Sequence, residues 1–304
     1  MILSHYNALM NCRFIFPIID FPRKLLNKIS RTILNVESFS RDARRSDSQI
    51  TFYEKSVRDI IQSDRKFNRF RRVYNYREIL EHLSFADGLK YLGELNKDFP
   101  QWRLRVEEFR LNDKIGKPRV YEYDGVGKFS PTTLRYIFVA HDLERLFGNQ
   151  KISRVVEIGA GYGGQFAILQ RLRKIPDYLI FDLPEVQMLI EKFLSKLLIE
   201  PAKLPKFPPS EFENLPIDLV ISNYAFSELP REIQTVYLAE VCQYARNGYL
   251  IMNSGIGNFT GRSDGKLRLE EIRRFIPNIQ IHPERPSTGP DNYLLYWNEA
   301  PYGE

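Results

Sequence analysis

A glycine-rich stretch constrains the fold of this chain more than any other feature of its sequence. The stretch spans residues 159–164, GAGYGG, after a short apolar run at Arg154–Ile158 and before a helical pattern at about Gly164–Arg173. Glycines permit a tight turn and let a ligand approach the backbone, and the first turn of a helix offers free amide donors. A strand, a glycine turn and a helix in this order predict an α/β sheet with a nucleotide-like site at the turn.

Strand and helix patterns alternate along the second half of the chain. Apolar runs of strand length stand at Arg154–Ile158, Asp177–Phe181, Ile217–Ser222 and Gly248–Met252, with helical patterns at Pro184–Leu198, Pro230–Tyr244 and Lys266–Phe275. Such alternation predicts βαβ units and a mostly parallel sheet. Two further strands, Asn278–His282 and Tyr293–Trp297, have only a short link and should pair antiparallel.

The first half of the chain is mainly helical in pattern. Apolar residues recur at helical spacing in Thr51–Ser63 and Tyr76–Asn96, and Ser130-Pro131 introduces a helix at Thr132–Phe147. The alternation within Trp102–Phe109 predicts an extended segment, and residues 112–131 are rich in turn residues. These patterns divide the chain into a helical lid or substrate region (1–110), a connecting segment and helix (111–150), and a cofactor-binding catalytic domain (151–304).

Composition places the chain among ordinary globular proteins, with 43% hydrophobic and 27% charged residues. No run of about 18 apolar residues is present, so no transmembrane helix is predicted. The apolar stretch Phe14–Ile19 lacks the basic start and cleavage site of a signal peptide. Cys12 and Cys242 stand far apart in sequence, which argues against a disulfide framework or a zinc cluster and favours a cytoplasmic location.

Positive charge is concentrated near the N-terminus. Residues 1–80 contain 16 Lys and Arg against 8 Asp and Glu, whereas the whole chain carries a net charge of +6. A solvated helical face is the ordinary interpretation. The alternative is an anionic partner, either a lipid-linked substrate or the inner face of a membrane, with the protein peripheral to it. Nucleic acid is not an expected partner, because no zinc finger or RNP-like sequence is present.

Two carboxylates near the glycine-rich stretch narrow the choice of cofactor. Asp182 follows the second strand, about 20 residues on, where a carboxylate accepts ribose hydroxyls. Glu157 stands two positions before Gly159, and its charge suits the cationic amino-acid end of S-adenosylmethionine but not a pyrophosphate. The pair favours S-adenosylmethionine, and an NAD-dependent oxidoreductase is the alternative.

Four segments resemble a known family. VEIGAGYGG (156–164) resembles motif I of class I S-adenosylmethionine-dependent methyltransferases, and IFDLPEV (180–186) resembles the second motif of small-molecule O-methyltransferases. Together with DLVISNYAFSELP (218–230) and GYLIMN (248–253), they resemble a family of sugar O-methyltransferases whose members accompany genes for antibiotic sugars and surface polysaccharides. The resemblance covers roughly residues 110–300. It implies a Rossmann-like class I methyltransferase sheet, mostly parallel with an antiparallel C-terminal hairpin, and O-methylation of a sugar hydroxyl in a glycan, nucleotide sugar or lipid-linked saccharide.

The same resemblance implies roles for individual residues at the cofactor. The residues expected to bind S-adenosylmethionine are Glu157, Gly159, Ala160, Gly161 and Gly163 at its methionine end, Asp182 and Leu183 at its ribose, and Ser222 and Asn223 near its sulfonium. The residue that stacks on adenine is expected at about Pro208–Phe212.

Methyl transfer to an alcohol also needs a group that removes the hydroxyl proton. Glu228, His282 and Tyr224 are the candidate catalytic residues, and His141 is a further candidate base. The competing interpretations are structural histidines and, for Glu228, a charge that favours a helix N-terminus. A metal could acidify the hydroxyl instead, but Glu228, Asp264 and Asp291 form no paired carboxylates, so no metal site is predicted.

A segment rich in hydrogen-bond donors precedes the catalytic domain. Its sequence is SPTTLRY (130–136), and the residues expected to bind substrate are Ser130, Thr132, Thr133, Arg135 and Tyr136. A helix N-terminus with hydroxyls and an arginine suits a polyol or a phosphate. Simple capping of the helix is an equal alternative.

Other functions stay open at the level of sequence. The same motifs fit an O-methyltransferase of a polyketide or phenolic compound. A third hypothesis is a non-catalytic methyltransferase-like binding subunit. The intact glycines and Asp182 argue against it. A nucleic-acid methyltransferase is disfavoured, because residues 222–225 read SNYA and lack the Asn-Pro-Pro-Tyr pattern of amino-methylating enzymes.

Overall fold

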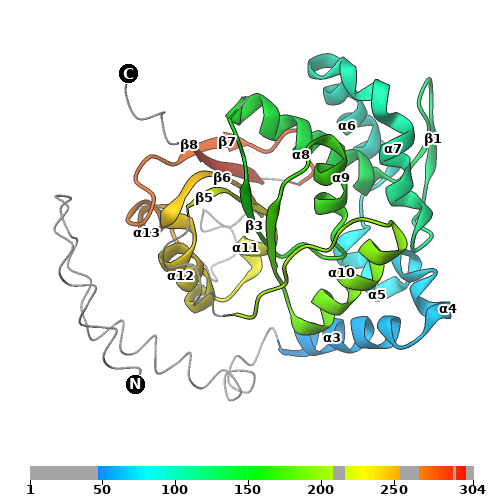
Figure 1. The fold of residues 1–304 in the computed structure, drawn as a ribbon, viewed down its shortest axis with the longest axis horizontal. Coiled ribbons are helices and arrows are strands. Elements are labelled where there is room, and N and C mark those ends of the chain that lie inside the picture. Colours follow the sequence, from blue (N-terminus) through cyan, green and yellow to red (C-terminus); the bar gives the residue numbers. More distant parts are fainter. Residues whose placement is uncertain (1–46, 149, 208–215, 254–266, 290–291, 299–304) are drawn as a thin grey trace. The chain divides into compact units, whose positions relative to one another are not determined.

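The computed structural model describes residues 47–148, 150–207, 216–253, 267–289 and 292–298, with side chains from residue 53 onward (Figure 1). Contacts group the chain from Ser48 onward into one compact unit. The helices are α3 (Asp47–Ile61), α4 (Asp64–Phe67), η2 (Phe70–Arg72), α5 (Tyr74–Leu80), α6 (Phe85–Asp98), η3 (Pro100–Arg105), α7 (Val106–Arg110), η4 (Leu111–Lys114), α8 (Pro131–Phe147), α9 (Gly164–Leu172), α10 (Pro184–Lys196), α11 (Ala225–Glu228), α12 (Arg231–Glu240), η5 (Cys242–Tyr244) and α13 (Leu269–Arg273). The strands are β1 (Tyr121–Tyr123), β2 (Gly127–Phe129), β3 (Arg154–Ile158), β4 (Asp177–Phe181), β5 (Ile217–Asn223), β6 (Ala245–Met252), β7 (Gln280–Pro283) and β8 (Tyr293–Asn298).

The central sheet places its described strands in the order β4-β3-β5-β6-β8-β7. The first four run parallel, with Val156 of β3 opposite Leu179 on one side and Val220 on the other. Strand β8 runs antiparallel to both β6 and β7. The prediction of a parallel sheet with an antiparallel C-terminal pair is therefore confirmed, and this is the Rossmann-like class I methyltransferase arrangement that the motifs implied.

Both faces of the sheet are covered, because side chains of successive residues in a strand point to opposite faces. Val155 and Ile180 belong to a buried cluster shared with α8, α9 and α10. Val156 belongs to a second cluster, with Leu238 of α12 and Ile272 of α13. Figure 1 shows α8 and α9 on one side of β3 and α12 and α13 on the other. The two layers leave the carboxyl ends of the parallel strands as the edge at which a ligand can bind.

The N-terminal helices pack at that edge. A Cβ placed on Gly161 would lie 3.0 Å from a methyl carbon of Leu80, at the end of α5. Arg58 of α3 forms an ion pair with Glu185, in the first turn of α10, at 2.6 Å. Helices α3 and α5 therefore lie against the glycine-rich turn and the segment after β4, where the predicted lid would be.

Helices α3 and α8 match the predicted ones, but two predictions for the first half of the chain are wrong. The segment Trp102–Phe109 is not extended, because it forms η3 and most of α7. The predicted helix Tyr76–Asn96 is two helices, separated where Ser84 begins α6 with a capping box. Among the described residues, no helix is both long and apolar enough to cross a bilayer.

Candidate cofactor and acceptor site

The glycine-rich turn between β3 and α9 depends on backbone conformations that other residues rarely adopt. Gly159, Gly161 and Gly163 have φ values of +72°, +60° and +83°. Gly159 also lies in a crowded place, because a Cβ there would come within 2.1 Å of the Cβ of Ala225. Its backbone N–H donates to the carbonyl of Phe181 at 2.8 Å, which holds the turn against the end of β4.

Asp182 lies directly after β4 and faces this turn. Its carboxylate accepts hydrogen bonds from the backbone N–H of Gly161 at 3.1 Å and of Leu183 at 2.8 Å. Burial raises the pKa of Asp182 to about 7, although these backbone donors oppose the shift. The sequence therefore folds a carboxylate against the glycine-rich turn, as expected for a ribose-binding residue, and that role stays a prediction.

Glu157 is a second carboxylate beside the turn and, unlike the partly buried Asp182, has only 1% of its surface exposed. Its carboxylate accepts a hydrogen bond from the hydroxyl of Tyr178 at 2.7 Å. Burial raises its pKa to about 7, and the charge of Asp182 adds to the shift. No cation pairs with Glu157 among the described side chains. Two carboxylates that have no ion pair with a described side chain suit a ligand that carries a positive charge.

The end of β5 contributes a structural serine and a polar asparagine. Ser222 is fully buried, donates to the carbonyl of Ile158 at 2.8 Å and accepts from the N–H of Phe226 at 3.0 Å. Its hydroxyl thus ties β5 to β3. Asn223 donates to the Oε1 of Gln165 at 3.3 Å, while its own Oδ1 is buried without a partner in the described structure. Asn223 therefore offers an acceptor to a ligand, and Ser222 supports the edge.

Tyr224 leaves β5 in a strained conformation, with φ at +71°. Its hydroxyl donates to Glu284 and lies 3.3 Å from the Oγ1 of Thr288. Burial raises the pKa of Tyr224 to about 12, and Glu284 adds to this shift. Tyr224 is thus a hydrogen-bonding group rather than an anion at neutral pH. Sequence reasoning missed Glu284 and Thr288, which follow β7 and reach Tyr224 only through the folding of the sheet.

Arg135 and Tyr136 lie in the first half of α8, close to this edge. The guanidinium of Arg135 lies 5.4 Å from the ring centroids of both Tyr136 and Tyr224. The carbonyl of Tyr136 accepts from Gln165 of α9 at 3.1 Å. These two predicted substrate-binding residues therefore border the glycine-rich turn and the end of β5.

The hydroxyls that begin α8 have partners within the protein. Ser130 caps the helix by accepting from the N–H of Thr133 at 3.1 Å, and both hydroxyls donate to Asp113 at 2.7 Å. Arg71 donates to Ser130 at 3.0 Å. Thr132 donates to the carbonyl of Leu80 at 3.4 Å. The capping alternative accounts for Ser130 and Thr133, and their binding of substrate stays a prediction without support from these contacts.

The candidate bases lie in different parts of the fold. Glu228 is exposed at the end of α11 and accepts from Asn253 at 2.5 Å. His282 is exposed on β7, the outermost strand, with Tyr296 at 3.2 Å. His141 is buried in α8, stacked on Phe99 and bonded to Glu144 at 3.0 Å, in keeping with the structural interpretation.

His82, which the sequence did not single out as a base, follows α5 on the same side of the molecule as Glu228. Partial burial lowers the pKa of His82, the charge of Arg135 lowers it further, and Glu228 acts in the opposite direction. A histidine held neutral near pH 7 can accept a proton. No signal in the sequence distinguishes His82, because its neighbours come from α8 and α11.

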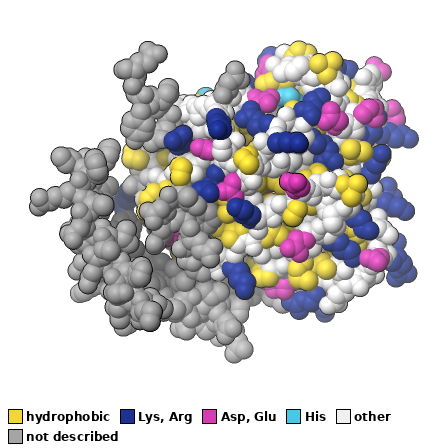
Figure 2. Space-filling view, in the orientation of Figure 1, with side chains coloured by type: hydrophobic (Ala, Val, Ile, Leu, Met, Phe, Trp, Pro, Cys, Tyr) yellow, Lys and Arg dark blue, Asp and Glu magenta, His cyan; other side chains and the backbone are white. Residues whose placement is uncertain are grey.

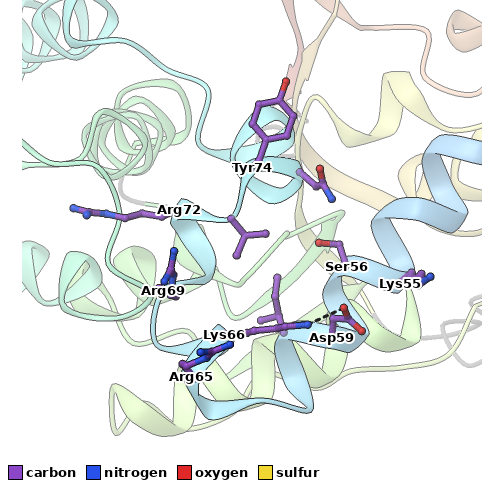
Figure 3. Close-up of a pocket in the computed structure, with 11 residues that line it drawn as sticks. Lys55, Ser56, Asp59, Arg65, Lys66, Arg69, Arg72 and Tyr74 are labelled. Atoms are coloured by element: carbon purple, nitrogen blue, oxygen red, sulfur yellow. Dashed lines mark hydrogen bonds and ion pairs between the residues drawn. The ribbon is translucent and has the colours of Figure 1, made fainter.

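A basic pocket lies between α3 and the segment that joins it to α5 (Figure 3). Its volume is about 560 Å³, and its lining includes Lys55, Asp59, Arg65, Lys66, Arg69, Arg72 and Tyr74. Lys66 pairs with Asp59 at 2.9 Å, so the one lining carboxylate is already neutralised. Figure 2 shows Lys and Arg side chains gathered along the side of the molecule that carries α4.

Besides Glu228, the carboxylates considered for a metal site are Asp264 and Asp291, and both lie outside the described residues. The expected adenine contact, Pro208–Phe212, also lies outside them. Within the described part of the chain, no group of three His, Cys, Asp or Glu side chains is arranged to hold a metal ion.

No family model matches this chain, and no curated protein matches it in sequence. Solved structures do match. EvdMO1 aligns with 17% identity over 66% of this chain and 47% of its own, with a TM-score of 0.41. Its N-terminal domain, crystallised in the presence of S-adenosylhomocysteine and D-fucose, aligns with 14% identity over 66% and 97%, at 0.40. TrmK of M. capricolum with S-adenosylhomocysteine aligns with 17% identity over 55% and 70%, at 0.39.

This chain spans about half of the EvdMO1 chain, at 47%. All three identities are below 25% and all three TM-scores are below 0.5. The assignment of the fold therefore rests on the strand order and on the glycine-rich turn between β3 and α9.

Proposed function

We propose that this protein is an S-adenosylmethionine-dependent O-methyltransferase. The observation that carries the proposal is the pair of carboxylates, the buried Glu157 and the partly buried Asp182. They lie beside a turn whose three glycines have positive φ, at the carboxyl edge of this sheet. The residues present fit the cofactor, because within the described ranges the Oδ1 of Asn223 has no hydrogen-bond partner and Glu157 has no paired cation. An NAD pyrophosphate would bring negative charge toward the same two carboxylates, which is unfavourable.

When bound, the cofactor supplies an electrophilic methyl group, and the chain must align an acceptor hydroxyl and take its proton. Alignment can contribute up to ~7–11 kcal/mol, and a positioned base ~100–10,000-fold in rate. Tyr224, held by Glu284 and Thr288, would orient the acceptor through its hydroxyl. Glu228 and His82 are the candidate bases of this proposal, and His282 is a weaker one because it lies on the outermost strand.

The proposed acceptor is a sugar hydroxyl, as the resemblance of the four sequence segments implies. Polar groups around Tyr224 support a polyol, since the hydroxyls of Tyr224 and Thr288, which donate to Glu284, can still accept hydrogen bonds. A polyketide or phenolic acceptor is the alternative within the same reaction class, and the tyrosine rings beside Arg135 would favour it.

We further propose that the basic pocket holds an anionic group of the acceptor, such as the pyrophosphate of a nucleotide sugar or lipid-linked saccharide. Helix α5 begins at the pocket with Tyr74 and ends with Leu80 at the glycine-rich turn. Six residues of helix rise span about 9 Å. An acceptor anchored in the pocket could therefore reach the cofactor edge.

The experiment that tests the proposed function is calorimetric titration of the purified protein with S-adenosylhomocysteine, and with NAD in parallel. We expect binding of S-adenosylhomocysteine alone, with a stoichiometry of one. Binding of NAD alone would overturn the proposal in favour of an oxidoreductase. Binding of neither would favour a non-catalytic methyltransferase-like subunit.

A further inference from the structure

Arg135 is a buried cation that has no counter-ion in the part of the chain that the structure describes. Only 3% of its surface is exposed, and no carboxylate lies within 4 Å of its guanidinium among the described side chains. Its Nε is buried and has no hydrogen-bond partner there. The aromatic rings of Tyr136 and Tyr224 flank its guanidinium. Burying an unpaired charge is unfavourable, so this arrangement requires an explanation.

A second buried arginine shows how the same fold treats a structural guanidinium. Arg71 is 1% exposed and pairs with Glu81 at 2.5 Å and with Asp113 at 3.1 Å. It also donates to Ser130 and to the carbonyl of Asn112. The charge of Arg71 is therefore neutralised by ion pairs, whereas the charge of Arg135, in helix α8, has no ion pair among the described side chains. The difference indicates that no described side chain serves as the counter-ion of Arg135, which leaves this place open to a ligand.

The position of Arg135 identifies which ligand group can reach it. Tyr136, the next residue, packs against the start of α9, where its ring lies 2.4 Å from a Cβ placed on Gly164. Tyr224 follows Asn223 at the end of β5. Arg135 therefore stands between Tyr136, which borders the glycine-rich turn, and Tyr224, which follows β5. Glu284 forms no ion pair with Arg135, and its carboxylate accepts hydrogen bonds from Tyr224, Thr288 and Asn292 instead.

We propose that Arg135 binds the carboxylate at the amino-acid end of the cofactor. The inference rests on the proposed function, because it assumes an S-adenosylmethionine-type ligand at this edge. The amino-acid end of that ligand is a zwitterion, and the site offers one group of each sign. Among the described side chains Glu157 has no paired cation and Arg135 no paired anion, so one ammonium and one carboxylate would supply both partners. This assigns Arg135 to the cofactor rather than to the acceptor.

The test compares two ligands and two proteins. One ligand is S-adenosylhomocysteine, and the other is its analogue that lacks only the carboxylate. Calorimetry measures the affinity of each ligand for the wild-type protein and for the Arg135→Gln variant. We expect the wild type to bind S-adenosylhomocysteine roughly 10- to 100-fold more tightly than the analogue, the range of a hydrogen-bonded charge pair. The variant should bind both ligands with similar affinity, close to that of the wild type for the analogue.

The matched control is Arg145→Gln, which removes an arginine paired with Asp142 near the end of the same helix. This variant should keep the wild-type preference for the carboxylate. Thermal unfolding of the ligand-free Arg135→Gln protein should show no loss of stability, since the substitution removes an uncompensated charge.

Two results would overturn the proposal. One is a wild type that binds both ligands equally, and the other is an Arg135→Gln variant that keeps the wild-type preference, as expected if Arg135 serves an anionic acceptor. A wild type that binds neither ligand would instead overturn the proposed function. The preference between ligands, not activity, is therefore the deciding measurement.

Discussion

Asp182 is the residue at which the proposed cofactor can be tested most directly. Asp182→Asn keeps the size of the side chain and one acceptor for the N–H groups of Gly161 and Leu183, but it removes the charge. Charged hydrogen bonds contribute about 1.5–3 kcal/mol each, so we expect S-adenosylhomocysteine to bind roughly 10- to 100-fold more weakly. Asp177→Asn, at the other end of β4, is the matched control and should bind normally. Equal affinities of the two variants would contradict the role of Asp182.

The raised pKa values of Glu157 and Asp182 predict a pH-dependent affinity. Both values are near 7, so each carboxyl holds a proton at pH 6 and must lose it to bind a cation or accept ribose hydroxyls as a carboxylate. The affinity for S-adenosylhomocysteine should fall as the pH decreases from 8 to 6, by up to about tenfold per unit for each carboxyl. Calorimetry in buffers of different ionisation enthalpy should show proton release at pH 6. A flat profile would exclude protonated carboxyls at the site.

The same shifts have the opposite effect on the stability of the ligand-free protein. Between about pH 4 and pH 7 the native state holds protons that the unfolded chain has lost, because these carboxyls titrate near 4 when exposed. Their contribution to the free energy of unfolding therefore decreases as the pH rises through this interval. Ligand binding should offset the loss above pH 7.

The part of the site that follows from local sequence was predictable. The glycine-rich turn and Asp182 stand at fixed distances along one βαβ unit, and the structure brings them together. His82, Glu284 and Thr288 were not predictable in this way. They reach the site from α5 and from the segment after β7, through packing that no local pattern encodes. Ser222 lies near the end of β5, and its hydroxyl donates to the carbonyl of Ile158 in β3, a tertiary contact that the local sequence does not reveal.

At the scale of elements, the start of α8 is a structural junction. Ser130→Ala should destabilise the protein by about 1–2 kcal/mol, because it removes a helix cap and leaves Asp113 and Arg71 with one partner fewer. Urea unfolding measures this difference. The affinity for S-adenosylhomocysteine should not change, with Ser195→Ala, on the exposed end of α10, as the control for both quantities. Unchanged stability would contradict the capping role.

Short apolar patterns explain both the wrongly predicted segment Trp102–Phe109 and the hairpin that was not predicted. In Trp102–Phe109 the apolar residues alternate, yet Leu104 is 87% exposed while Trp102 and Phe109 are buried. Pro100 begins a helical turn, and Arg105 pairs with Glu108 at a spacing of three residues, which suits a helix. The hairpin of β1 and β2 was not predicted, because strands of three residues carry too short a pattern.

At the scale of the whole molecule, the uneven charge of the sequence has a structural counterpart. The excess of Lys and Arg before residue 80 includes Lys55, Arg65 and Arg69, which line the pocket without an ion pair to any described carboxylate. A solvated basic face would spread such groups over a convex surface. Here they surround a cavity of about 560 Å³, with Tyr74 at its margin (Figure 3).

The pocket therefore predicts salt-dependent binding of a compact polyanion. Inorganic pyrophosphate should bind to the wild-type protein, more weakly as salt increases, because screening reduces its attraction to the lining. The double variant Arg65→Gln, Arg69→Gln should bind it about tenfold more weakly. The matched control is Arg273→Gln, Arg274→Gln at the end of α13, which removes the same charge far from the pocket in the sheet's other layer. Calorimetry at low and high salt measures each affinity.

Vesicles distinguish a pocket from a basic face that meets a membrane. A surface role predicts binding to vesicles of anionic lipid but not of phosphatidylcholine, with equal losses in both double variants, since such attraction depends mainly on total charge. The acceptor pocket predicts instead that pyrophosphate competes and that only the Arg65 and Arg69 substitutions matter. Vesicle binding without pyrophosphate binding would contradict the pocket and assign the excess charge of residues 1–80 to the membrane surface.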